Sequence, residues 1–170
     1  MDKAALIVEI PRLRRYARAM LGNPAAADDL VQDTLERAWS RLALWRVGSD
    51  LRAWLFGIMH NLRVDQLRRS SVSMTSIDEE EIDVPTRATQ NDQLEMRDLE
   101  SALRQLPDEQ REILLLVALE EMRYEEIAAT LNIPLGTVMS RLSRGRERLR
   151  QIMDGRVGGN LPSANLRVVR

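Results

Sequence analysis

Apolar residues recur at helical spacing in each segment of this chain that has a regular pattern. The first stripe, at positions i, i+3, i+4, i+7 and i+8, consists of Leu13, Tyr16, Ala17, Met20 and Leu21. Residues 30–42 and 54–62 repeat this period, and runs of the β-branched and aromatic residues that strands favour are scarce. The pattern therefore predicts an all-α protein.

Composition narrows the class of protein. Hydrophobic residues make up 44% and charged residues 30%, which is typical of a globular protein. The longest apolar run, from Ile113 to Leu119, is too short to cross a bilayer, and the N-terminus lacks the pattern of a secretory signal. With no cysteine, neither disulfides nor a thiolate metal site can form. We expect a cytoplasmic protein without a cofactor or a metal.

Charge divides the chain into blocks. Residues 1–70 carry a net charge of +4, residues 71–100 carry −7, and residues 101–170 carry +2. The apolar period is lost over residues 71–93, which are rich in Ser, Thr and acidic side chains. We therefore predict an N-terminal domain (1–70), a flexible acidic linker (71–93), a C-terminal domain (94–153) and a disordered tail (154–170). Two basic blocks suggest two small domains that each face a polyanion.

Residues 124–144, YEEIAATLNIPLGTVMSRLSR, have the pattern of a helix-turn-helix. Ala128 is small where the two helices must approach closely. Asn132 stands in the turn, where the backbone must be left-handed and Asn is tolerated next best after Gly. The two helices would be held together by the apolar residues Ile127, Leu131, Val138 and Leu142.

The outer face of the second helix is polar and basic. It comprises Thr137, Ser140, Arg141 and Arg144, followed by Arg146, Arg148 and Arg150. In a helix-turn-helix the second helix enters the major groove, where Arg grips guanine through two hydrogen bonds and Ser or Thr binds phosphates or bases. The alternative is a solvated amphipathic helix of an ordinary bundle. We favour DNA binding.

Three stretches, in order along the chain, carry a family resemblance. They are ADDLVQDTLERAW (residues 27–39), LRAWLFGIMHNLRVDQLRR (residues 51–69) and the segment from Leu106 to Arg150. They resemble, respectively, the polymerase-docking helix, the promoter-melting helix and the C-terminal DNA-binding domain of the extracytoplasmic-function (ECF, group IV) sigma factors of bacterial RNA polymerase. The resemblance covers about residues 10–69 and 94–153.

The resemblance implies partners and site residues. The partners are core RNA polymerase, promoter DNA with −10 and −35 elements, and an anti-sigma factor that controls the protein, which would serve a stress or environmental regulon. Core polymerase would bind Asp29, Leu30 (partly exposed), Gln32, Asp33 and Arg37. The −10 element would contact Trp45, Arg52, Asn61, Arg63, Arg68 and Arg69. The −35 element would contact Thr137, Ser140, Arg141, Arg144 and Arg148. Trp39 and Trp54 lie on apolar stripes and are expected in the core.

Two positions depart from the family pattern. Glu121 and Arg123 stand where the family often has Gly and then Ser or Thr, a change that would remove a left-handed helix stop and a hydroxyl N-cap. Two other functions remain as alternatives. A stand-alone regulator would need a dimerisation element, and none is evident. An enzyme is the weaker alternative, because His60 is the only histidine and is better explained as a structural or surface residue.

Overall fold

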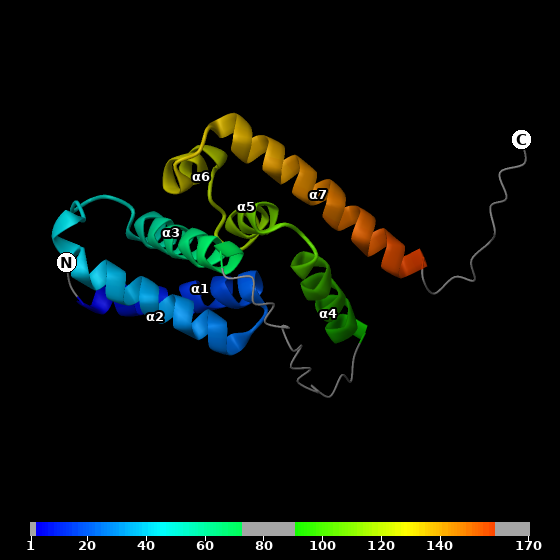
Figure 1. The fold of residues 1–170 in the computed structure, drawn as a ribbon, viewed down its shortest axis with the longest axis horizontal. Helices are drawn as coiled ribbons and strands as arrows, with labels where there is room; N and C mark the ends of the chain where they lie inside the picture. The colour runs from blue at the N-terminus through cyan, green and yellow to red at the C-terminus, as the bar shows by residue number, and fades with distance from the viewer. Residues whose placement is uncertain (1–2, 73–90, 159–170) are drawn as a thin grey trace, which may run out of the picture.

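A computed structural model describes residues 3–72 and 91–158, and every regular element within these two ranges is a helix (Figure 1). The N-terminal helices are α1 (Lys3–Leu21), α2 (Pro24–Ser40), the short 3₁₀ helix η1 (Leu42–Leu44) and α3 (Leu51–Val72). The C-terminal helices are α4 (Asn91–Arg104), α5 (Asp108–Ala118), α6 (Tyr124–Leu131) and α7 (Leu135–Gly158). The predicted all-α class is confirmed.

The turn between α1 and α2 follows from two residues. Gly22 takes a φ of 68°, which ends α1 without a Cβ penalty. The side-chain oxygen of Asn23 accepts hydrogen bonds from the backbone N–H groups of Ala25 (2.9 Å) and Ala26 (3.2 Å). Pro24 then occupies the first turn of α2, where the absence of an N–H costs nothing. The two helices thus fold back on each other as a pair.

The N-terminal helices bury one apolar face each. Leu13 and Tyr16 of α1, Leu30 of α2, and Leu55 and Phe56 of α3 are all nearly inaccessible to solvent. The rings of Tyr16 and Phe56 meet edge to face, with centroids 4.9 Å apart. Such aromatic pairs add to the stability gained from burial, so this contact fixes α3 against α1.

The C-terminal helices are arranged around α5. Four successive residues, from Ile113 to Leu116, are buried, as expected for the central helix of a bundle. Asp108 and Glu109 occupy its first turn, where acids interact favourably with the helix dipole. The long helix α7 packs along α5, and α6 packs against the N-terminal half of the chain as well as α7.

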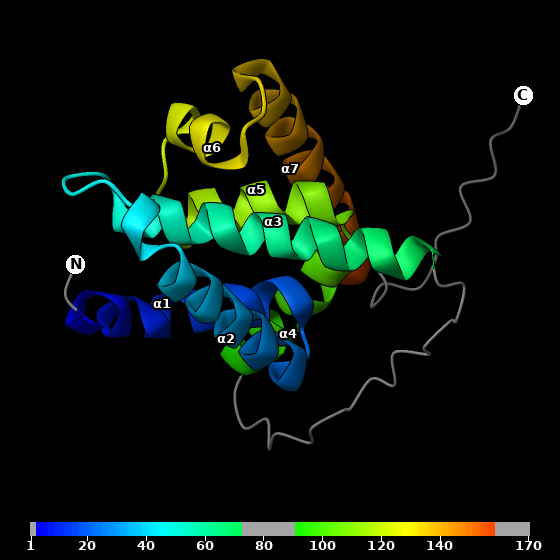
Figure 2. The same ribbon diagram turned by 60° about the vertical axis from the view of Figure 1, so that its left-hand side comes forward.

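The two halves of the chain share one hydrophobic core. α1 packs on α4 and α5, and α3 packs on α6, so Figure 2 shows the N-terminal helices directly against the C-terminal ones. The backbones of α3 and α6 come close at Gly57, where an added Cβ would lie 3.2 Å from the carbonyl oxygen of Thr130. Whether the halves pack together could not be inferred from the sequence.

Some boundaries differ from the sequence prediction. α4 begins at Asn91, and α7 continues to Gly158 rather than ending near Met153. Extending an existing helix adds one backbone hydrogen bond for each residue that is fixed, which favours this continuation.

The acidic segment Asp78–Glu81 lies outside the described residues. Within the described ranges, no helix is both long and apolar enough to cross a membrane.

Candidate polymerase and nucleic-acid interfaces

The turn between α6 and α7 has the geometry of a helix-turn-helix. Asn132 is left-handed, with φ 55° and ψ 50°, and the N–H of Ile133 donates to the carbonyl oxygen of Ala128 at 3.0 Å. At the start of α6 the carboxylate of Glu126 accepts the N–H of Arg123 at 2.9 Å. This bond is the half of a capping box in which the side chain at the third helical position accepts the N–H of the N-cap residue, and it orders the start of α6 although position 123 has no hydroxyl. The four predicted apolar contacts, Ile127, Leu131, Val138 and Leu142, are all buried.

The outer face of α7 presents part of the predicted −35 set to solvent. Arg144 and Arg148 are exposed, and Thr137 and Ser140 are half-buried. Arg141 lies on the flank nearest α5, where its guanidinium is 3.6 Å from the carboxylate of Glu109. Between α6 and α7 lies an open groove of about 550 Å³, and it is lined by Tyr124, Met139, Leu142, Ser143, Arg146, Glu147 and Arg150. The sequence did not predict this groove.

The polar face of α2 is open to solvent. Asp29, Gln32, Asp33 and Arg37 are exposed, and Gln32 donates to Glu36 at 3.3 Å. Leu30, predicted to be partly exposed on this face, is only 1% exposed, so that prediction is wrong. The helical period places Leu30 beside Ala27, Val31 and Thr34, which point into the core.

The expectation for Trp39 is also wrong. This side chain is 48% exposed because it lies on the flank of the last turn of α2 rather than on its buried stripe. The Nζ atom of Lys3 is 5.0 Å from the centre of its ring, within the range of a cation–π interaction. Trp54, expected in the core, is half-buried and packs against it.

The predicted −10 residues fall into three groups. Asn61, Arg68 and Arg69 are exposed on α3. Arg52 and Arg63 instead bind the C-terminal half: Arg52 donates to the carbonyl oxygen of Glu120 at 2.7 Å, and Arg63 donates to the carboxylate of Asp108 at 3.1 Å. The indole N–H of Trp45 is buried and has no acceptor in the described part of the chain.

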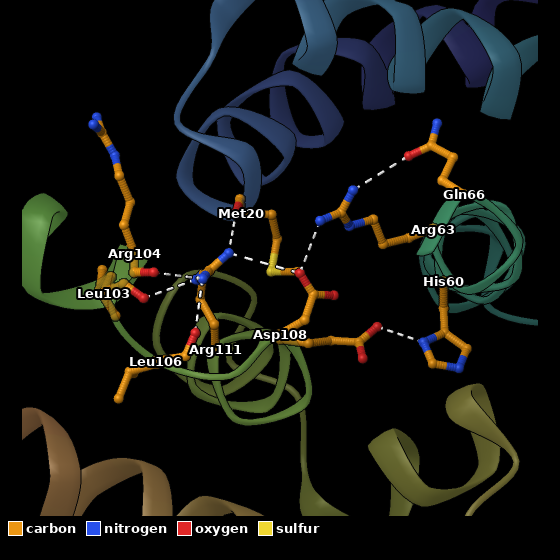
Figure 3. Close-up of polar contacts among 10 residues, drawn as sticks. Met20, His60, Arg63, Gln66, Leu103, Arg104, Leu106, Asp108 and Arg111 are labelled. Carbon is orange, nitrogen blue, oxygen red and sulfur yellow. Dashed lines mark hydrogen bonds and ion pairs between the residues drawn. The ribbon is translucent and has the colours of Figure 1, made fainter. Parts of the chain in front are cut away.

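A polar interface joins α3 to α5 (Figure 3). His60 Nδ1 lies 2.6 Å from the carboxylate of Glu112, and both side chains are largely buried. Arg63 lies one turn further along α3 and contacts the carboxylate of Asp108. The same carboxylate lies 3.7 Å from the guanidinium of Arg111. The structural explanation for His60 is therefore supported. The sequence did not predict the roles of Asp108 and Glu112, because nothing local indicates a partner about fifty residues away.

A second buried carboxylate lies at the end of α5. The side chain of Glu120 is fully buried, 3.2 Å from Arg12 Nε and 3.6 Å from Arg15 Nη2. Burial raises the pKa of Glu120, and the nearby charges of Arg12, Arg15 and Arg52 oppose that rise. The pKa of Tyr16 is raised well above its usual value, first by burial and then by Glu112, Asp108 and Glu120. The carboxylates of this region thus converge on the N-terminal helices.

Comparison with known proteins identifies both halves of the fold. Residues 6–60 match the family described as the Sigma2 domain of PhyR, and residues 96–149 match Sigma-70, region 4. A Sigma2 domain followed by a region 4 domain with a helix-turn-helix defines a sigma factor.

Individual relatives define the family. The chain is 35% identical to the ECF RNA polymerase sigma factor EcfG of Rhodopseudomonas palustris, over 87% of this chain and 82% of the relative. It is 30% identical to the ECF RNA polymerase sigma factor SigW of Bacillus subtilis, over 88% of each. This chain belongs to the ECF RNA polymerase sigma factors, which are regulatory proteins rather than enzymes.

A solved structure shares the arrangement of both halves. It is the sigma factor RpoE from Bartonella quintana in complex with the anti-sigma factor NepR. The match has a TM-score of 0.75 and 35% identity, and covers 89% of this chain and 96% of the other.

Proposed function

We propose that this chain binds core RNA polymerase through α2, melts the −10 element with α3 and reads the −35 element with α7. The observation that carries the proposal is the left-handed turn at Asn132, which joins two helices held together by buried apolar residues and leaves the basic outer face of α7 open to solvent. The chain that carries this face of α7 also carries a Sigma2 domain. We assign the helices up to Val72 to the first domain and the helices from Asn91 to Gly158 to the second domain, with the linker between them.

The −35 contacts would come from the first turns of α7. Arg144 and Arg148 are exposed and offer bidentate donors to guanine or to phosphate, while the hydroxyl groups of Thr137 and Ser140 lie on the same face. Arg141 would first have to leave Glu109, an exposed pair that costs little to break.

The −10 contacts would come from α3 and the loop before it. Trp45 would offer its ring as a stacking surface for an unstacked base. Asn61 adds a hydrogen-bonding group, and Arg68 and Arg69 are exposed for phosphates. Arg52 and Arg63 would join them after leaving the C-terminal half.

Core polymerase would meet the polar face of α2. Asp29, Gln32, Asp33 and Arg37 form a continuous exposed row there. Leu30 contributes only by holding the helix in place, since its side chain is buried. We further propose that the protein is a cytoplasmic group IV factor that serves a stress regulon and is held inactive by an anti-sigma factor, because a relative of the same arrangement was solved with one.

Multi-round transcription with purified core polymerase on a library of genomic promoter fragments tests this function. We expect specific transcripts only when the protein is present, and shared −10 and −35 sequences among the active fragments. Arg144→Gln should abolish dependence on the −35 element, whereas Arg41→Gln, an exposed change at the end of α2, should not. If no transcript appears and the protein alone shifts a duplex, it is a stand-alone regulator.

A further inference from the structure

We propose that α7 carries a surface that reads thymine, in which the exposed apolar side chains of Leu135 and Met139 contact the C5-methyl group of a thymine in the −35 element. This inference rests on the proposed function and deepens it, because it names a base that the −35 face distinguishes. The residues already proposed for this face, such as Ser140 and Arg144, offer hydrogen bonds and charge but no apolar contact. We call Leu135 and Met139 together the apolar strip.

The apolar strip lies at the start of α7. Met139 is 52% exposed and Leu135 is 40% exposed. Residues four positions apart lie one above the other on the same face of a helix, so the two side chains form a continuous strip over the first turns of α7. Val138 and Leu142 supply the buried apolar contacts of these turns, so the exposed strip is not part of the core.

The space in front of the apolar strip is open. Met139 lines the groove between α6 and α7 together with Tyr124 and Ser143. Nothing lies within 4 Å of a Cβ added at Gly136, so the first turn of α7 is uncovered as well. In Figure 1 these turns lie at the upper edge of the molecule, beside α6. The edge of a base pair can therefore approach the strip without displacing another part of the described chain.

The charges around the apolar strip favour a nucleic acid as its partner. Arg146 and Arg150 line the same groove, and Arg144 is exposed on the next turn of α7. Glu147 is the acid of the groove lining, and its carboxylate accepts hydrogen bonds from Arg150 at 2.9 Å and from Gln151 at 3.1 Å. The groove thus keeps a net positive charge beside an apolar contact. This combination suits DNA, in which anionic phosphates flank the bases.

The chemistry of the major groove then determines the base. The second helix of a helix-turn-helix places its N-terminal residues against base edges in the major groove. The C5-methyl group of thymine is the apolar group that these edges present, whereas the other bases offer hydrogen-bond donors and acceptors. Methionine suits this contact because its unbranched thioether side chain adapts to a small apolar group. Met139 therefore predicts a preference for thymine within the −35 element.

Deoxyuridine substitution tests this contact, because it removes only the C5-methyl group of thymine. A promoter fragment that the protein transcribes with core polymerase is rebuilt with deoxyuridine at each −35 thymine in turn, on either strand. Wild type, Met139→Ala and Met96→Ala are compared on these templates. Met96 of α4 is the matched control, because it is 59% exposed and lies outside the helix-turn-helix.

We expect deoxyuridine at one thymine, or at two neighbouring ones, to lower the initiation rate of wild type about three- to fivefold, as expected for one lost methyl contact. Met96→Ala should show the same loss. Met139→Ala should transcribe the thymine and deoxyuridine templates equally, whereas Met139→Leu, which keeps an apolar side chain, should retain the difference. The ratio between the two templates should not change with salt concentration, because no phosphate contact is altered.

Two results would overturn the inference. If no −35 deoxyuridine affects wild type, thymine methyl groups are not read, and if wild type and Met139→Ala lose activity equally, another residue reads them. Titration of a labelled duplex with the full-length protein, followed by fluorescence anisotropy at low salt, separates these results from failure of the proposed function. A methyl effect on duplex binding that depends on Met139, without any transcript from the thymine template, would support the inference and contradict the proposed function.

Discussion

The guanidinium of Arg111 donates to the carbonyl oxygen of Met20 at 2.6 Å, which ties α5 to the end of α1 (Figure 3). The same side chain donates to the carbonyl oxygens of Leu103 (2.8 Å), Arg104 (3.0 Å) and Leu106 (2.8 Å) at the end of α4. The last carbonyl groups of a helix have no partner within it, so one side chain completes two helix ends.

Replacing Arg111 should therefore destabilise the whole fold. Arg111→Gln cannot reach four carbonyl oxygens and would leave several of them unpaired, at about 1–3 kcal/mol for each that stays buried. We expect a loss of about 3 kcal/mol in the free energy of unfolding, measured by urea denaturation. Arg46→Gln, at an exposed loop position, should change it by less than about 0.5 kcal/mol. Equal stabilities would show that water satisfies these carbonyl groups.

Substitutions at the neighbouring residues Leu30 and Asp29 should have different effects: the first should lower stability, and the second should lower the affinity for core polymerase. Leu30→Ala leaves a cavity in the N-terminal core and should cost about 2–5 kcal/mol of unfolding free energy. Asp29→Ala removes an exposed charge and should leave stability nearly unchanged while it weakens binding to core polymerase. Denaturant unfolding and a fluorescence titration with core polymerase measure the two effects. If Asp29→Ala binds as wild type does, the polymerase contact lies elsewhere.

Glu121 stands where the family often has Gly, and replacing it with Gly should stabilise the protein. Its φ is 50°, so the left-handed stop expected of Gly is present but is formed by a residue with a Cβ. Left-handed backbone costs a non-glycine residue about 1–2 kcal/mol. Glu121→Gly should raise the free energy of unfolding by about 1 kcal/mol, and Glu121→Ala should not. A melting temperature that rises equally for both would assign the effect to the lost charge rather than to the backbone.

The sequence predicted the local structure well and the long-range contacts poorly. The left-handed turn at Asn132 depends on a few adjacent residues, and its prediction is confirmed. The pair of His60 and Glu112 joins residues 52 positions apart, and no periodicity can reveal it. Leu30 was predicted to be partly exposed because of its role in the family, and Trp39 was predicted to be buried because it lies on an apolar stripe. Neither prediction took into account which side of α2 faces the core.

His60 and Glu112 should be energetically coupled. At 2.6 Å in a largely buried setting, removal of either partner leaves the other without its hydrogen bond. We expect His60→Ala and Glu112→Gln each to cost about 1–3 kcal/mol, and the double variant to cost less than their sum by about 1 kcal/mol. A double-mutant cycle of unfolding free energies gives the coupling. Strict additivity would mean that the two side chains meet without stabilising the packing of α3 on α5.

Glu120 should make stability depend on pH with an uncommon sign. Its pKa in the folded protein is raised by burial above the ordinary value of 4.5, despite Arg12 and Arg15. Below both pKa values the carboxyl group is protonated in the folded and the unfolded chain, and its contribution is fully present. Between the two values the unfolded chain has lost the proton that the folded chain still binds, so stability falls as pH rises.

Glu120→Gln cannot ionise, and the stability of wild type minus that of this variant should therefore decrease from about pH 4 upward and then level off. Urea denaturation of both proteins between about pH 4 and pH 8 measures this difference. A difference that increased with pH would mean that the two arginines outweigh burial and hold the pKa of Glu120 below its ordinary value.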